Sequence, residues 1–122
     1  MRRPPEDPKR EQRIIDEIIV DAYGPEEQAM SWHIHLGDHL SFPFRAKCIK
    51  AHAISPLRKG EEVTVVGMAP EEDCESDMLV IIEWCERTLG VPLAQLEGAS
   101  VDKETKQAIA DWRYWIAQGY EF

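Results

Sequence analysis

Hydrophobic positions recur every three or four residues in three stretches of the chain, which is the spacing of amphipathic helices. The first stretch is predicted to be helical from about Glu11 and to end near Tyr23, before a glycine–proline pair that favours a helix boundary. The second follows at once and runs to about Leu40. In the third, Asp102 can cap a helix that Gly119 should end. The pattern predicts two N-terminal helices and one C-terminal helix.

Between the second and third helices the apolar residues form short runs separated by turn residues, which is typical of strands. Residues 42–49 alternate between apolar and polar, and residues 61–68 form a second run. Residues 78–85 are almost continuously apolar, which predicts burial on both faces, and in residues 88–93 Pro92 indicates a strand end or a sheet edge. Four or five strands with no helix between them predict an α+β domain built on a small SH3-like antiparallel barrel.

Composition places this domain among soluble proteins. The 122 residues are enough for one domain, and 43% hydrophobic residues with four tryptophans argue against disorder. No apolar run approaches the roughly 18 residues that a membrane span needs. The first eight residues hold three prolines, so we expect a mobile tail, and they lack the apolar stretch of a secretory signal. We therefore expect one domain over residues 1–122, located in the cytoplasm and not in a membrane.

The charge and the cysteine content limit which partners and which cellular compartment are expected. The formal net charge is −9; residues 1–13 carry +2, so the remainder carries −11 and should repel nucleic-acid phosphates. We expect no nucleic-acid partner. Three cysteines without CxxC spacing are typical of free thiols in a reducing compartment. Cys48 and Cys85 lie in predicted strands, where buried packing is expected.

The segment from Glu71 to Asp77 is the most unusual part of the sequence, because five of its seven residues are carboxylates between two predicted strands. Their mutual repulsion would be offset by a hard cation, and Ca2+ accepts six to eight oxygen ligands in irregular geometry. The segment does not fit an EF-hand, which needs a glycine where Met78 stands and a glutamate where Trp84 stands. A solvated acidic hairpin that only adds solubility is the alternative interpretation.

Asp38 is a second candidate ligand. It lies near the predicted end of the second helix, where the negative end of the helix dipole disfavours a carboxylate and a cation would relieve the repulsion. Simple exposure to solvent is the more ordinary explanation of this position.

Other potentially reactive residues have structural explanations. His35 and His39 have the i,i+4 spacing of paired zinc ligands, but HExxH and an assured third ligand are missing, so a solvated helix face is favoured. Trp112 and Trp115, at helical spacing, are expected in the core. No nucleophile elbow and no glycine-rich phosphate loop is present, so we do not expect an enzyme.

Several segments taken in order resemble the small non-EF-hand calcium-binding protein family of cyanobacteria and other bacteria. The similarity covers nearly everything after residue 13. The segments that carry it are Ile19–Tyr23, Glu26–Met30, Trp32, Leu36, Phe42–Cys48, Ile54–Leu57, Val66–Glu72, Val91–Leu96, Ala110–Trp115 and Gly119–Phe122.

The resemblance implies a compact mixed fold that binds Ca2+ without EF-hands and buffers free calcium in the cytosol. The site residues it implies are Asp38, Glu71, Glu72, Asp73, Glu75 and Asp77. The competing hypothesis is an SH3-like module that binds a protein partner and uses the acidic segment as a steering surface.

Overall fold

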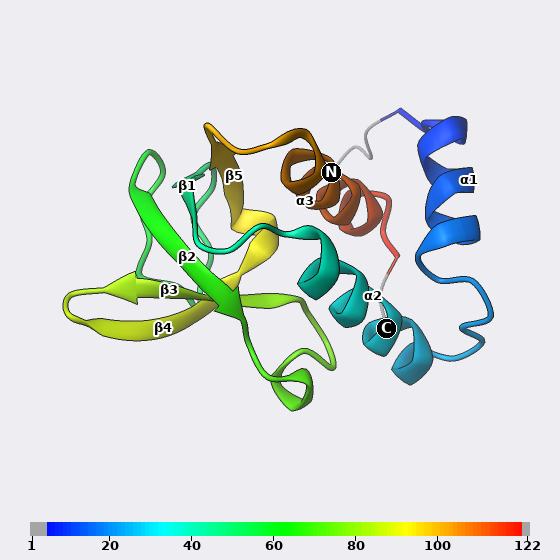
Figure 1. The fold of residues 1–122 in the computed structure, drawn as a ribbon, viewed down its shortest axis with the longest axis horizontal. Coiled ribbons are helices and arrows are strands. Elements are labelled where there is room, and N and C mark those ends of the chain that lie inside the picture. Colours follow the sequence, from blue (N-terminus) through cyan, green and yellow to red (C-terminus); the bar gives the residue numbers. More distant parts are fainter. Residues whose placement is uncertain (1–4, 121–122) are drawn as a thin grey trace.

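The computed structural model describes residues 5–120 and shows an antiparallel sheet beside three helices (Figure 1). The helices are α1 (Pro8–Glu17), α2 (Pro25–His39) and α3 (Lys103–Ala117). The strands are β1 (Phe44–Cys48), β2 (Glu62–Met68), β3 (Leu79–Trp84), β4 (Arg87–Pro92) and β5 (Leu96–Ala99). Two short 3-10 helices, η1 (Glu71–Asp73) and η2 (Leu93–Gln95), connect strands. The predicted α+β class is confirmed.

The five strands form one sheet in the order β4-β3-β2-β1-β5, and all neighbouring strands are antiparallel. The register between β2 and β3 shifts between Val65 and Gly67, which marks a bulge. Within residues 5–120 no ladder joins the outer strands β4 and β5. The sheet is therefore open, and the closed SH3-like barrel stays a prediction.

The strand predictions from 42 to 93 are confirmed in position, and Pro92 ends the outer strand β4 as expected. Burial of β3 on both faces is wrong. Val80 and Ile82 are fully buried, whereas Leu79 and Ile81 on the opposite face are only half-buried. A run of apolar residues thus alternates in burial because one face of β3 is turned to the core and the other is only partly covered.

The first helix starts earlier and ends earlier than its apolar stripe predicts. The Asp7 side chain accepts a hydrogen bond from the Arg10 backbone N–H at 3.1 Å, and Pro8 suits the first helical turn. Past Glu17 the chain turns, and Asp21 adopts a positive φ of 60°. Of the predicted mobile tail, residues 1–4 lie outside the described residues.

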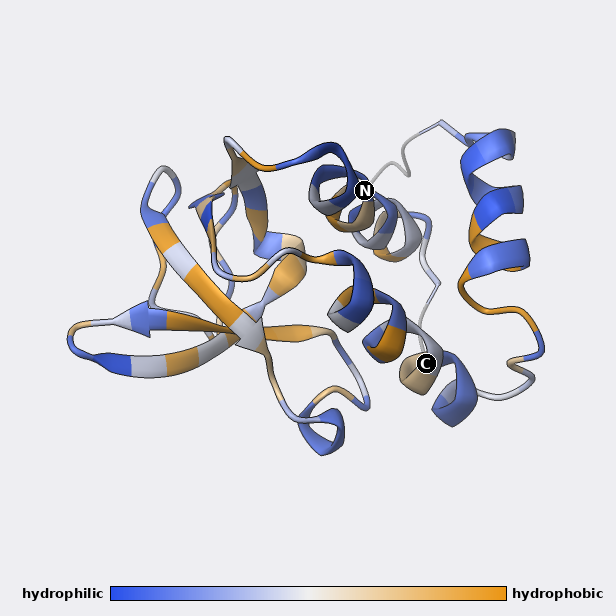
Figure 2. Ribbon diagram, in the orientation of Figure 1, coloured by the Kyte–Doolittle hydropathy of each residue, from blue (hydrophilic) through white to orange (hydrophobic). Residues whose placement is uncertain are grey.

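The core lies between α2, α3 and the inner face of the sheet. Trp32 of α2 packs against Trp112 and Trp115 of α3, with ring centroids 5.0 Å and 5.9 Å apart, and all three are buried. The core prediction for Trp112 and Trp115 is confirmed. Hydrophobic residues in Figure 2 follow the strands and the inner sides of the helices. No helix among the described residues is long and apolar enough to span a membrane.

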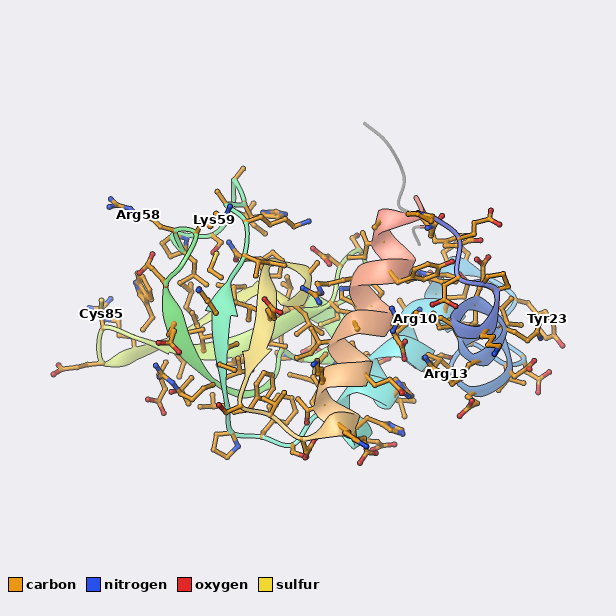
Figure 3. All side chains as sticks on the ribbon, turned by 90° about the horizontal axis from the view of Figure 1, so that it is seen from above. Arg10, Arg13, Tyr23, Arg58, Lys59 and Cys85 are labelled. Atoms are coloured by element: carbon orange, nitrogen blue, oxygen red, sulfur yellow. The ribbon has the colours of Figure 1, made fainter. Side chains whose placement is uncertain are left out.

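Helix α1 is attached to α3 by a polar cluster. Asp111 is fully buried and accepts two hydrogen bonds from the Arg13 guanidinium at 2.7 Å and 2.8 Å, while Arg10 approaches it at 3.2 Å. Figure 3 shows both arginines pointing from α1 toward α3. This pairing raises the pKa of Arg13, so the guanidinium stays charged in its half-buried place.

All three cysteines are free, and they differ in burial. Cys48 and Cys74 are buried. Cys85 lies exposed at the tip of the β3–β4 hairpin (Figure 3), so the prediction that it packs in the core is wrong. It occupies the turn with a φ of 48°.

Candidate functional site

The acidic segment connects β2 to β3, as predicted, and its backbone is well braced. The Ala69 N–H donates to the Leu79 carbonyl at 3.0 Å and closes the loop at its base. Within the loop, η1 is formed by the Asp73 N–H donating to the Pro70 carbonyl at 2.9 Å. The acidic side chains therefore project from a folded turn, which is hydrophilic in Figure 2.

Cys74 anchors this loop from below. It is 1% exposed, and its sulfur lies 3.8 Å from the Ala69 carbonyl oxygen and 3.5 Å from the Leu79 nitrogen. Burial raises the pKa of the thiol, so it stays protonated and serves as a packing group. Met78 is also fully buried. Two apolar side chains thus hold the segment to the core while Glu71, Glu72, Asp73 and Glu75 are exposed.

A groove lies between this loop and the first two turns of α2. Four carboxylates line it, three from the loop and one from the helix, together with Ala29, Met30 and Cys74; the carboxylates are Glu26, Glu71, Glu72 and Glu75. No lysine or arginine is among its lining residues. It encloses about 360 Å³, which is room for an ion and several waters because a water in the liquid occupies roughly 30 Å³.

His33 fixes the position of the groove's two walls. Its Nε2 lies 2.8 Å from the Ala69 carbonyl oxygen, and since a carbonyl only accepts, the ring N–H donates. The bond joins the middle of α2 to the start of the acidic loop. The four carboxylates are therefore held near one another by tertiary contacts.

Asp77 lies at the other end of the loop, and its Oδ1 is buried without a hydrogen-bond partner in the described structure. Burial raises the pKa of this carboxyl, against a backbone hydrogen bond from Met78 and the charges of His52 and Lys50, which lower it. An unpaired buried carboxylate oxygen is costly. It is the kind of donor that a bound cation would satisfy.

The other candidate ligands lie apart from the groove. Asp73 is exposed on η1. Asp38 is exposed near the end of α2, twelve residues beyond Glu26, which is about 18 Å along a helix. Asp38 and the loop carboxylates therefore do not line one groove.

The donor set fits a hard oxygen-seeking cation, because carboxylates and loop carbonyls are what Ca2+ prefers. Among residues 5–120 the side chains as they stand form no group of three or more histidine, cysteine, aspartate or glutamate residues that could hold a metal ion. The four carboxylates of the groove line one space, and like charges that share a space repel when nothing neutralises them.

Sequence reasoning missed Glu26 as a site residue. Its place in the first turn of α2 explains it as a favourable partner of the helix dipole. Its approach to Glu71 and Glu72 is set by how α2 packs against the loop, a contact 45 residues apart in sequence. No local signal in the sequence reports that contact.

Comparison with known proteins identifies the family to which the chain belongs. Residues 12–116 match the model of the CcbP family, which is described as calcium binding. The chain belongs to this calcium-binding family, and the resemblance found from sequence is confirmed.

Two solved structures are similar over almost the whole chain. The crystal structure of CcbP from Anabaena is 41% identical and has a TM-score of 0.87, with 100% of both chains covered. A calcium binding protein in its calcium-binding form is also 41% identical, with a TM-score of 0.84 and 96% of both chains covered. No curated protein sequence matches significantly. The ion that the family binds is Ca2+.

Proposed function

We propose that this protein binds Ca2+ through a non-EF-hand set of carboxylates and acts as a calcium buffer in the cytoplasm. The acidic loop supplies Glu71, Glu72 and Glu75, and α2 adds Glu26 to the same groove. Asp73 and Asp77 are further ligands offered by the loop, and Asp38 is a separate ligand on α2.

The observation that carries this proposal is the uncompensated charge of the groove. Four carboxylates from two elements face one space that no basic side chain lines. At roughly 4–6 Å separation such charges repel by several tenths of a kcal/mol to a few kcal/mol per pair, depending on solvent screening. A dication bound between them attracts each carboxylate and so offsets this repulsion, and water can complete its coordination.

The architecture of the site favours a buffer over a sensor. The loop is held at its base by the Ala69–Leu79 hydrogen bond and from below by buried Cys74 and Met78. Ligands can gather by side-chain rotation while this framework stays in place. A sensor needs a bistable element that exposes a new surface, and side-chain rotation on a braced loop exposes none.

Calorimetric titration of chelator-stripped protein with Ca2+ tests the proposal. The triple variant Glu71→Gln, Glu72→Gln, Glu75→Gln should weaken the tightest binding event at least tenfold, because amides ligate without charge. The matched control is Glu62→Gln, Glu83→Gln, Glu86→Gln, which removes equal charge from exposed strand and turn positions.

The control separates ligation from the general attraction of an acidic protein. Ligation in the groove requires the control to bind within about twofold of the unaltered protein, since distant exposed charges are screened. An equal loss of Ca2+ affinity in both triple variants would show that the loop carboxylates act only through the net charge of the protein. An unaltered affinity in the loop variant would move the site elsewhere, with Asp38 the next position to test.

A further inference from the structure

We propose that Lys50 is a built-in counter-charge of the acidic loop, which acts on Asp77 and lowers the affinity of the loop for Ca2+. The inference rests on the proposed function and deepens it, because it names a residue that sets the strength of the same site. Lys50 lies in the connection between β1 and β2, in a different segment of the chain from Asp77. The fold brings the two segments together.

The short helix η2 links the acidic loop to the segment that carries Lys50. At its first residue, the Leu93 N–H donates to the carbonyl of Met78, which directly follows Asp77, at 2.9 Å. At its last residue, the Gln95 carbonyl accepts from the backbone N–H of the residue before Lys50 at 2.8 Å. The fully buried Gln95 side chain also donates from Nε2 to the Lys50 carbonyl at 3.1 Å. Both segments are therefore fixed to opposite ends of one helix.

Asp77 is the loop carboxylate on which this charge acts. Its Oδ1 is buried without a hydrogen-bond partner in the described structure, and the positive charges that act on it are those of His52 and Lys50. A lysine ammonium carries a full charge and cannot ligate a cation. Lys50 takes part in no ion pair among the described residues. It therefore attracts Asp77 through space, and no contact has to break before an ion binds.

Lys50 opposes Ca2+ in two ways. It repels the dication directly, and it partly offsets the negative charge that attracts the ion to Asp77. Neither the acidic segment nor the lining of the groove contains a lysine or an arginine, so this positive charge comes from outside the loop. Salt screens charges that are exposed to solvent within about 10 Å at 0.1 M ionic strength. The effect on affinity is accordingly a few-fold change and not a loss of binding.

This charge would set the working range of a buffer. A buffer takes up and releases its ion most effectively when the free ion concentration is close to its Kd. A positive charge beside the loop raises that Kd, so the site would fill at higher free Ca2+ than its carboxylates alone would allow. Lys50 is thus a positioning residue for charge and not a ligand.

The test is a calorimetric titration of the chelator-stripped full chain with Ca2+. At low ionic strength Lys50→Gln should bind Ca2+ about threefold more tightly than the unaltered protein, and the gain should shrink at about 0.5 M KCl. The matched control is Lys59→Gln, which removes an equal charge from an exposed position at the other end of the same connection. Its affinity should stay within about 1.5-fold of the unaltered protein, since a distant exposed charge is screened.

Two further variants separate charge from structure. Lys50→Arg keeps the positive charge and should bind Ca2+ as the unaltered protein does, whereas a purely structural role of the side chain predicts a change. In an Asp77→Asn background, the gain from Lys50→Gln should fall by at least half, because the carboxylate on which the lysine acts is gone.

Three results would overturn the proposal: equal changes of affinity in Lys50→Gln and Lys59→Gln, tighter binding in Lys50→Arg, or a gain from Lys50→Gln that persists in full without the Asp77 carboxylate. Each would refute the role of Lys50 and leave Ca2+ binding by the groove carboxylates in place. Absence of Ca2+ binding in the unaltered protein would instead refute the proposed function itself.

Discussion

Two aspartates illustrate how this protein handles carboxylates that are removed from water. Asp111 is fully buried and receives both Arg13 hydrogen bonds, so its charge is matched where it is desolvated. Asp77 is half-buried with one oxygen unpaired, and its pKa is raised. Pairing makes the first a structural residue. The unpaired oxygen of the second is a cost to the metal-free fold that a bound cation can offset.

Replacing Asp111 by asparagine should lower the free energy of unfolding by about 2 kcal/mol, because it leaves the Arg13 charge without its counter-ion. We expect less than the 3–5 kcal/mol typical of fully buried pairs, since the Arg13 side chain keeps 27% of its exposure. Urea denaturation measures the change. Asp16→Asn is the matched control on the exposed side of α1 and should change stability by less than about 0.5 kcal/mol.

Replacing Asp77 by asparagine should raise the melting temperature of calcium-free protein at pH 7. A carboxyl whose pKa is raised on folding contributes stability below its unfolded pKa of about 3.8 and loses that contribution as pH rises through the folded pKa. The gain should therefore shrink between pH 7 and pH 4, as the carboxyl of the unaltered protein takes up its proton. Thermal unfolding followed by circular dichroism at the two pH values measures this, and a gain independent of pH would refute the explanation.

At the scale of elements, the β3–β4 hairpin is the place where local sequence and backbone conformation agree least. Its two turn residues, Cys85 and Glu86, have φ values of 48° and 65°. Two-residue hairpin turns with positive φ favour Asn-Gly, because a side chain in the left-handed region costs about 1–2 kcal/mol per residue. The hairpin forms here because the strands on either side of the turn pair along their whole length.

Replacing Glu86 by glycine should therefore increase the free energy of unfolding by about 0.5 kcal/mol. Relief of the left-handed conformation outweighs the extra freedom that glycine gives the unfolded chain. Chemical denaturation measures the difference. The control is Glu83→Gly inside β3, where glycine has no conformational advantage and should destabilise by about 1 kcal/mol. Destabilisation by both substitutions would show that the turn is not strained.

Periodicity predicted α2, α3 and the first four strands because each presents a clear apolar face to the core. It extended α1 too far, since Ile18 and Ile19 continue the apolar stripe while the backbone already turns after Glu17. It did not assign β5, which has only four residues and includes Glu97 and Gly98. That strand exists because its backbone pairs with β1, from Cys48↔Leu96 to Arg45↔Ala99, and such pairing leaves little trace in a short sequence.

On the scale of the whole molecule, the net charge of −9 attracts any cation, so a specific site must be distinguished from general screening. Ca2+ at a hundred times its Kd should stabilise the fold by about 2.7 kcal/mol, or roughly 10 °C in melting temperature for a domain of this size. Differential scanning calorimetry against a sodium salt of equal ionic strength makes the comparison. Equal shifts with the two salts would favour the alternative, an interaction module with an acidic surface.

Sequence alone determined the α+β class, the order of most elements, the acidic loop between β2 and β3, and the calcium-binding family. The class, the element order and the acidic loop follow from local composition and from periodicity, which a single segment carries by itself. The family follows from the resemblance of several segments taken in order. Only the tertiary structure decided that Glu26 faces the loop, that Asp38 lies apart from it, and that Glu104 approaches His39. Those contacts join residues 45 to 65 positions apart, and the packing of whole helices sets them, which no local pattern encodes.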